Sequence, residues 1–328
     1  MKKKIALITG IGGQDGSYLA EFLLKKKYKV YGILPRRSNP EFQTFRIEGI
    51  LNKINIVYGD ILDKLTLDDL IKKIKPHEIY HLAAQSHVGV SFKSPFITTQ
   101  IDYVGVINIL DSIRTNSPKS KFYNASTSEI YGNVNKNFSI NEESEKDPVS
   151  PYGISKLAAY YLTKVYRDSY NLYACSGILF NHESPRRGLN FVTAKIVKGA
   201  LEIKYKKRKK IELGYLDSKR DWGHAKDYVK AMWLMLQKKK PEDYVVATGI
   251  SKSVRDVCDM VFKKLELGDY RKFIKINKRY LRPNELYHLK GNANKARKLL
   301  KWKPEITFEE MINEMIVKLE ERFFNEKR

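Results

Sequence analysis

Short apolar segments alternate with amphipathic ones along the first half of the chain. The apolar segments predict strands buried on both faces, at residues 5–8, 29–34, 55–58, 78–84 and 121–125. Between them, apolar positions three and four residues apart predict helices at 18–24, 65–74 and 98–115. Strands alternating with helices in this way form a parallel sheet with right-handed crossovers. The pattern predicts an α/β fold with a doubly wound parallel sheet, whose ligands bind beyond the carboxyl ends of the strands.

The second half of the chain continues this pattern with more polar interruptions. Further strands are predicted at 174–180 and 244–247, and further helices at 192–201, 226–236 and 308–323. A helix also begins at Pro151, with Ser150 placed as its N-cap. Residues 181–188 and 220–224 are predicted to be loops outside the core, because they are polar and rich in turn-forming residues.

A glycine-rich turn follows the first strand directly. Gly10, Gly13 and Gly16 have the spacing of the short-chain dehydrogenase type, and a helix follows them. Backbone N–H groups without a neighbouring Cβ, at the positive end of a helix dipole, suit a diphosphate. Three glycines also occur in ordinary turns, but Arg36 and Arg37 at the end of the second strand add a second signal. Arginine there, in place of an acid, favours NADP over NAD and completes a Rossmann-type dinucleotide site.

Candidate catalytic groups lie near two of the predicted strand ends. Tyr152 and Lys156 share one face of a helix, where a lysine that lowers the pKa of the phenol would let it act as a base. Thr127 follows the fifth strand and offers a hydroxyl to a carbonyl, and Glu129 adds a carboxylate. A carboxylate there could remove a proton next to a new ketone, which is dehydratase chemistry. It could equally cap or form a salt bridge at the strand end.

Composition excludes several classes of protein. The 328 residues are 42% hydrophobic and contain no apolar run long enough to span a membrane. The N-terminus leads directly into a strand without the apolar stretch of a signal peptide, so we expect a cytoplasmic enzyme. Cys175 and Cys258 have no metal-ligand spacing and are expected to be buried free thiols. We expect no metal.

The net charge of +24 raises the question of nucleic-acid binding. Lysines cluster at 204–210 and 238–240, but they are also spread over the whole chain, which favours a solvated surface. A positive field would still attract an anionic substrate such as a nucleotide. We therefore expect neither a nucleic-acid nor a membrane partner.

Five blocks of sequence carry a family resemblance. Residues 9–21, 84–88, 125–132, 181–188 and 220–229 resemble the GDP-mannose 4,6-dehydratases of the extended short-chain dehydrogenase/reductase family. The resemblance extends from Ile5 to about Leu319. It implies conversion of GDP-D-mannose to GDP-4-keto-6-deoxy-D-mannose with tightly bound NADP, and a homotetramer built from dimers, or a homodimer. It also implies an NADP-binding Rossmann domain at 1–180 plus about 222–249 and a smaller interleaved GDP-sugar-binding domain at 181–221 plus about 250–328.

The resemblance also implies a role for individual residues. Tyr152 would deprotonate the 4-hydroxyl with the help of Lys156, Glu129 would take the C5 proton, and Thr127 or Glu129 would protonate the leaving 6-hydroxyl. The matching cofactor positions are Gly10, Ile11, Gly12, Gly13, Gln14, Asp15, Arg36, Arg37, Asp60, Ile61, Leu82, Ala83, Ala84, Gln85, Ser86, Lys156, His182 and Arg187. The matching substrate positions are Ser86, Thr127, Glu129, Asn181, Lys195, Arg220, Arg282 and Glu285.

Three segments depart from the family pattern. Gly12 stands where threonine is usual, the loop at 35–45 is longer, and the segment at 264–280 is shorter. An altered sugar pocket leaves a GDP-manno-heptose as an alternative substrate. A nucleotide-sugar epimerase or reductase is a second alternative, against which Glu129 beside Thr127 argues. An inactive dinucleotide sensor or nucleic-acid binder is a third, from a different functional class.

Overall fold

A seven-stranded parallel sheet forms the centre of the computed structural model, which describes residues 3–36, 38, 41–133 and 139–324. The strands lie in the order β10, β6, β5, β4, β1, β2, β3. Their bounds, in that order, are Tyr244–Val246, Ala174–Leu179, Lys121–Thr127, Glu78–His81, Ile5–Thr9, Lys29–Leu34 and Asn55–Tyr58. This arrangement confirms the predicted doubly wound fold.

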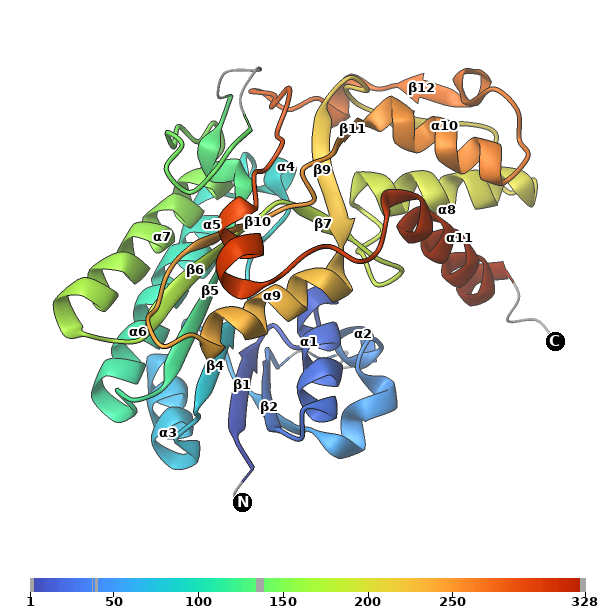
Figure 1. Cartoon of the computed structure of the whole chain (residues 1–328). Coiled ribbons are helices and arrows are strands. Elements are labelled where there is room, and N and C mark those ends of the chain that lie inside the picture. Colours follow the sequence, from blue (N-terminus) through green and yellow to red (C-terminus); the bar gives the residue numbers. More distant parts are fainter. Residues whose placement is uncertain (1–2, 37, 39–40, 134–138, 325–328) are drawn as a thin grey trace.

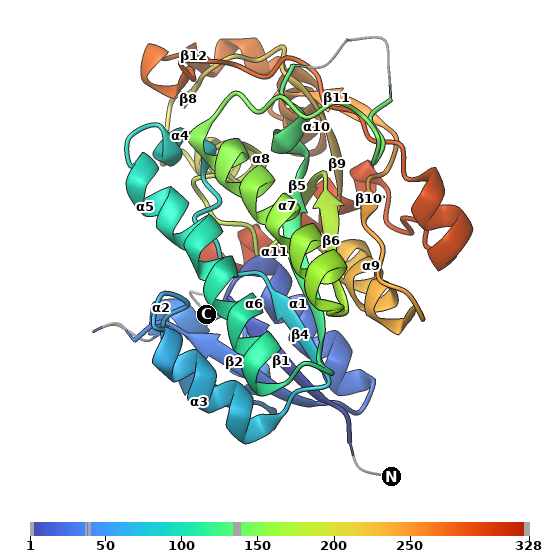
Figure 2. The ribbon, with the colours of Figure 1, turned by 90° about the vertical axis from the view of Figure 1, so that its left-hand side faces the viewer.

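Helices cover both faces of the sheet, as Figures 1 and 2 show. On one face lie α3 (Lys64–Ile74), α6 (Gly105–Asn116) and α7 (Pro151–Tyr170), and on the other α1 (Gln14–Lys25) and α9 (Ala225–Gln237). Successive residues of β1 point to opposite faces, so Leu7 joins the core beneath α3 and α6 whereas Ile8 joins the core beneath α1 and α9. Burial on both faces explains why the first strand is apolar throughout.

A smaller α/β part lies beyond the carboxyl ends of these strands (Figure 1). It contains the mixed sheet β11, β9, β7 and the pair β12, β8. Their bounds are Ser251–Ser253, Lys219–His224, Asn181–Glu183, Ile274–Ile276 and Ile211–Leu213. Helices α8 (Val192–Lys204), α10 (Val254–Lys264) and α11 (Phe308–Phe324) enclose a second hydrophobic core with these strands. Three short helices complete the fold: α2 (Glu41–Thr44), α4 (Val88–Ser91) and α5 (Pro95–Thr99).

Two predicted loops are in fact buried strands. The segment 181–188 contributes β7, in which Glu183 is 2% exposed, and the segment 220–224 lies within β9, in which Asp221 is fully buried. Hydrogen bonds compensate the buried polar groups: Asp221 accepts bonds from the backbone N–H groups of Thr248 and Gly249, at 2.8 Å each. A hydrophobicity pattern cannot reveal a strand whose polar side chains are satisfied by distant partners.

Two other predicted elements are interrupted. The strand predicted at 78–84 ends at His81, because the hydroxyl of Thr9 accepts hydrogen bonds from the N–H groups of Leu82 and Ala83, at 3.1 Å each. The helix predicted at 98–115 is divided into α5 and α6 by a π-helical turn, Gln100–Val104. Such turns occur preferentially at functional sites.

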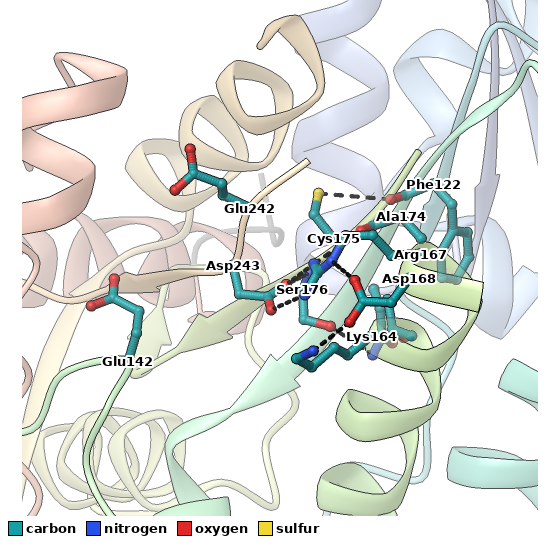
Figure 3. Close-up of polar contacts among 12 residues, drawn as sticks. Phe122, Glu142, Lys164, Arg167, Asp168, Ala174, Cys175, Ser176, Glu242 and Asp243 are labelled. Atoms are coloured by element: carbon teal, nitrogen blue, oxygen red, sulfur yellow. Dashed lines mark hydrogen bonds and ion pairs between the residues drawn. The ribbon is translucent and has the colours of Figure 1, made fainter. Parts of the chain in front are cut away.

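A partly buried ion pair fixes the C-terminal half of α7 to the edge of the sheet. Arg167 donates two hydrogen bonds to the carboxylate of Asp243, at 2.9 Å each, and a third to the carbonyl of Ala174 at 3.1 Å. Asp243 also accepts a bond from the N–H of Ser176 at 2.7 Å. Figure 3 shows these groups between α7, β6 and the segment that precedes β10. The pair therefore anchors the helix that carries Tyr152 at its other end.

The cysteines match their prediction: Cys175 and Cys258 are buried free thiols. Over the described residues, no helix combines the length and the apolar character that a membrane span requires. Within the same ranges, no three or more histidine, cysteine, aspartate or glutamate side chains come together in a group that could hold a metal ion.

Candidate active site

A cavity of about 1480 Å³ lies between the carboxyl ends of the large sheet and the smaller part. The turn after β1, the ends of β4 and β5, the start of α7, and segments of the smaller part line it. It brings together most of the site residues expected from the sequence. These are Gly10, Gly13, Gln14, Asp15, Asp60, Ile61, Leu82, Ala83, Ala84, Ser86, Thr127, Glu129, Tyr152, Lys156, Asn181, His182, Arg187, Lys195, Arg220, Arg282 and Glu285.

Four of the expected cofactor residues lie outside this lining. Ile11 is fully buried, and the backbone of Gly12 is pressed against a loop, so that a Cβ there would lie 2.2 Å from a carbonyl oxygen. The side chain of Gln85 is used within the fold and donates hydrogen bonds to the carbonyl of His87 and the hydroxyl of Thr98. Arg36 is exposed outside the cavity lining.

The remaining member of this set, Arg37, lies outside the described residues.

The glycine turn has the geometry that a dinucleotide requires. Gly10 has a φ of +71°, and a Cβ on it would lie 2.8 Å from the backbone nitrogen of Ala83. The N-cap of α1 is Gly13, and no side chain caps the helix. The first N–H groups of α1 therefore remain available to an anion at the positive end of the helix. The residues present fit the diphosphate of a dinucleotide cofactor.

An ion pair connects this turn to β7. His182 Nε2 lies 2.8 Å from an oxygen of Asp15, and His182 Nδ1 lies 2.8 Å from the carbonyl oxygen of Phe180. Burial would lower the pKa of His182, but the charge of Asp15 and the hydrogen bonds to Asp15 and Phe180 together raise it above its usual value. Burial would raise the pKa of Asp15, but the charge of His182 and the hydrogen bonds from His182 and Gln14 together lower it. With an acceptor at each nitrogen, the ring is an imidazolium that holds the end of the glycine turn.

Tyr152 and Lys156 lie on the first turns of α7, as the sequence predicts. The hydroxyl of Ser150 caps this helix by accepting a hydrogen bond from the N–H of Gly153 at 3.0 Å. Lys156 Nζ donates to the carbonyl of Ala125 at 3.1 Å, which ties the helix to β5. Both side chains are less than 10% exposed.

The electrostatics of this pair differ from the expectation. Burial raises the pKa of Tyr152 well above its usual range, and the charge of Asp102 raises it further. Burial lowers the pKa of Lys156. The expectation that Lys156 lowers the pKa of Tyr152 is therefore wrong for the protein groups alone, because desolvation dominates at this site.

Asp102 is a site residue that the sequence reasoning missed. It lies in the π-helical turn, is fully buried, and accepts a hydrogen bond from the N–H of Gln85 at 2.7 Å. Its second carboxylate oxygen has no hydrogen-bond partner among the described residues. Burial raises the pKa of Asp102 to about 6, against the opposing charge of Lys156. The sequence signal for Asp102 was an acidic residue placed between two apolar residues within the helix predicted at 98–115.

Of the alternatives that the sequence left open for Glu129, the structure shows the salt bridge, while its role as a base stays a prediction. The hydroxyl of Thr127 accepts a hydrogen bond from the N–H of Glu129 at 3.3 Å, which fixes the turn after β5. Glu129 also forms a salt bridge, with Nη1 of Arg282 3.3 Å from its Oε1. Its other oxygen, Oε2, has no hydrogen-bond partner within the described ranges. One carboxylate oxygen is thus held by Arg282 and the other is buried without a hydrogen-bond partner among the described residues, while the residue as a whole lines the cavity.

Cations gather at the end of the cavity formed by the smaller part. Arg220 of β9 is 5% exposed and lies 3.6 Å from a carboxylate oxygen of Glu285. Burial lowers the pKa of Arg220 to about 10, which leaves it charged at neutral pH. Lys195 of α8 lies over the ring of Tyr280, 3.3 Å from its centroid. Two arginines and a lysine suit a diphosphate group at this end.

Comparison with known proteins gives a family match over most of the chain. The profile of the family described as GDP-mannose 4,6 dehydratase matches residues 7–315. The protein of that name from Drosophila melanogaster is 47% identical, over 96% of this chain and 86% of its own length. The human protein of that name is 45% identical, over 96% of this chain and 91% of its own. The Vibrio cholerae GDP-mannose 4,6-dehydratase is 43% identical, over 96% and 93% respectively.

Solved structures share the fold at lower sequence identity. A dTDP-glucose 4,6-dehydratase from Bacillus anthracis, in complex with NAD, superposes with a TM-score of 0.85 at 24% identity, over 99% of this chain and all of its own. RMD from Pseudomonas aeruginosa, complexed with NADPH, superposes with a TM-score of 0.82 at 23% identity, over 98% of this chain and all of its own. At this level of identity the likeness establishes the fold.

Proposed function

The chain belongs to the GDP-mannose 4,6 dehydratase family, and on that basis we propose that it converts GDP-D-mannose to GDP-4-keto-6-deoxy-D-mannose and water. One observation supports the proposed reaction in particular. The carboxylate of Glu129 and the phenol of Tyr152, which come from different elements, line the same cavity. An oxidation followed by an elimination needs a base for each step, and these are two such bases.

We propose NADP as the cofactor, bound along the glycine turn and the end of β4. Two features support the choice: the turn leaves backbone N–H groups for a diphosphate, and Arg36 follows β2 without an acid beside it. When bound, NADP supplies a reversible hydride acceptor whose oxidised ring also carries a positive charge near Tyr152. That charge would offset the burial and the Asp102 carboxylate, which raise the pKa of the phenol.

The first step in this proposal is oxidation at C4. Tyr152 takes the proton of the 4-hydroxyl while the C4 hydrogen leaves as hydride. The hydroxyl of Thr127 donates a hydrogen bond to the oxygen that becomes the ketone. Lys156, held by the carbonyl of Ala125, positions the cofactor ribose beside Tyr152.

The second step is elimination across C5 and C6. The new ketone makes the C5 hydrogen acidic, and Glu129, whose side chain lines the cavity, removes that proton. The 6-hydroxyl then leaves as water, protonated by Thr127 or Glu129. A proton to C5 and a hydride to C6, which the bound cofactor would supply, would give the 6-deoxy product. One water is lost for each sugar.

We assign the GDP moiety to the cationic end of the cavity. Arg220, Arg282 and Lys195 would bind the diphosphate there, and Glu285 and Asn181 would bind hydroxyl groups, with Ser86 on the sugar. This follows the proposed division into a cofactor domain, at 1–180 with about 222–249, and a substrate domain at 181–221 with about 250–328. We also propose a homodimer or a homotetramer built from dimers.

Product analysis with two sugars tests this function. The purified protein is incubated separately with GDP-mannose and with a GDP-manno-heptose, and the nucleotide released on denaturation is identified by mass. The proposal predicts a 6-deoxy-4-keto product, faster turnover of GDP-mannose, and released NADP. A product that retains the 6-hydroxyl would indicate an epimerase or a reductase. Released NAD would contradict the cofactor assignment.

A further inference from the structure

Arg282 contacts the carboxylate that the proposed function uses as its second base. Its Nη1 lies 3.3 Å from Oε1 of Glu129, and its Nε lies 3.9 Å from Oε1 of Glu285. The side chain of Glu129 is 9% exposed, and that of Arg282 is 27% exposed. The arginine therefore spans the distance from a nearly buried carboxylate to the open part of the cavity.

The guanidinium of Arg282 has N–H groups that its contacts with Glu129 and Glu285 do not use. Its Nη2 makes no hydrogen bond to the part of the chain that the structure describes, so two N–H groups there remain available. Arginine presents its donors in a planar fork, which allows one edge to hold a carboxylate while another binds a phosphate oxygen. Arg220 lies beside it and shares Glu285 as a partner. This is the same region to which the diphosphate is assigned.

We propose that Arg282 is a positioning residue that couples the substrate diphosphate to Glu129. Through Nη1 it holds Oε1 of Glu129 and so fixes the carboxylate that takes the C5 proton, and through its remaining donors it binds the diphosphate. The proposal rests on the proposed function and adds to it a role beyond binding. The diphosphate, by fixing Arg282, would fix the geometry of a proton transfer several bonds away.

The consequence is a defect in one chemical step. Without Arg282, Glu129 would lose the contact that holds its Oε1, and a misplacement of about 1 Å in a reacting group can cost roughly a hundredfold in rate. The oxidation at C4 depends on Tyr152 and Lys156, which Arg282 does not contact in the described structure, and would proceed. Reduced nicotinamide should then accumulate, because elimination no longer keeps pace with oxidation.

The test uses the full-length protein with bound cofactor and saturating GDP-mannose. Stopped-flow absorbance follows reduced nicotinamide in the first turnover, and steady-state assays give kcat and KM. The variants are Arg282→Gln, Arg282→Lys as the conservative substitution, and Lys195→Gln as a matched control. Lys195→Gln also removes a cation from the cavity, but Lys195 lies over Tyr280 and forms no ion pair with Glu129 in the described part of the chain.

Arg282→Gln is expected to lower kcat about a hundredfold and to enlarge the burst of reduced nicotinamide relative to the wild type. Arg282→Lys should recover part of kcat, because an ammonium keeps the charge and loses the fork. Lys195→Gln should raise KM and leave the burst unchanged.

Two results would overturn the proposal: an Arg282→Gln protein that only raises KM, or one that loses kcat without a burst. If Arg282→Gln does not fold, the same readouts on Arg282→Lys decide between these outcomes. A wild-type protein that does not convert GDP-mannose would instead refute the proposed function itself.

Discussion

Replacing Asp102 by asparagine should stabilise the protein at neutral pH. Asp102 is fully buried in the π-helical turn, and burial raises its pKa from the ordinary 3.8 to about 6. Its ionised form is therefore unfavourable in the folded state, even with Lys156 nearby. Asparagine keeps an oxygen for the N–H of Gln85 and removes the charge. The substitution mimics the neutral acid, which is the form that burial favours.

The direction of this stability change follows from the number of protons that Asp102 binds in the folded and unfolded states. Between about pH 4 and pH 6 the folded protein binds more protons at Asp102 than the unfolded chain does, so the stability of the wild type falls as the pH rises through this window. Above this pH window the ionised carboxylate lowers the stability of the wild type by a constant amount. A pKa of about 6 in place of 3.8 corresponds to roughly 3 kcal/mol of stability. Relative to the wild type, Asp102→Asn should gain roughly 1.4 kcal/mol between about pH 5 and about pH 8.

Urea unfolding at a series of pH values measures this difference. Asp102→Leu is the matched control, because it removes the same titrating group and also the acceptor for Gln85. It should therefore follow the same pH dependence relative to the wild type, displaced toward lower stability by a constant amount. A gap between Asp102→Asn and the wild type that does not change with pH would refute the reasoning, because the buried carboxylate would then carry no penalty.

Three further substitutions test other parts of the account. Glu129→Gln should permit the first hydride transfer and block dehydration, so single-turnover product analysis should find oxidised sugar nucleotide that has not lost water. Gly10→Ala should lower the free energy of unfolding by about 1–2 kcal/mol, because alanine is strained at the positive φ of this position. It should also weaken NADP binding, as measured by calorimetry, because its Cβ would lie 2.8 Å from the backbone nitrogen of Ala83. Asp243→Asn should lower the free energy of unfolding in urea by about 1–2 kcal/mol, because Arg167 and the N–H of Ser176 would lose a charged hydrogen-bond partner; an unchanged value would assign the anchoring of α7 to other contacts.

The large sheet could be predicted from sequence because apolar residues cluster in its strands and amphipathic helices separate them. The predicted ranges for β2 and β3 match the structure residue for residue, and β1 is one residue longer than predicted. The polar strands β7 and β9 could not be predicted in this way. Their buried groups are paired with residues far along the chain, as His182 is with Asp15, and no local pattern records such a pairing.

The candidate site likewise combines residues that local sequence spacing predicts with contacts that it does not. Gly10, Tyr152 and Lys156 belong to local spacings whose chemistry is readable without a structure, and they line the cavity together. The contact between Glu129 and Arg282 joins residues 153 positions apart, so the sequence could suggest each residue but not their pairing. The raised pKa of Tyr152 likewise depends on burial, which exists only in the folded chain.

Incubation with GDP-mannose in heavy water tests the central claim most directly. The purified protein is used without added cofactor, and the sugar nucleotide is analysed by mass spectrometry and NMR. The account predicts loss of one water, a 6-deoxy-4-keto product, and deuterium at C5, because the proton that Glu129 removes is replaced from solvent. A product that keeps all its oxygen atoms, or a 6-deoxy product with the original hydrogen at C5, would contradict the account.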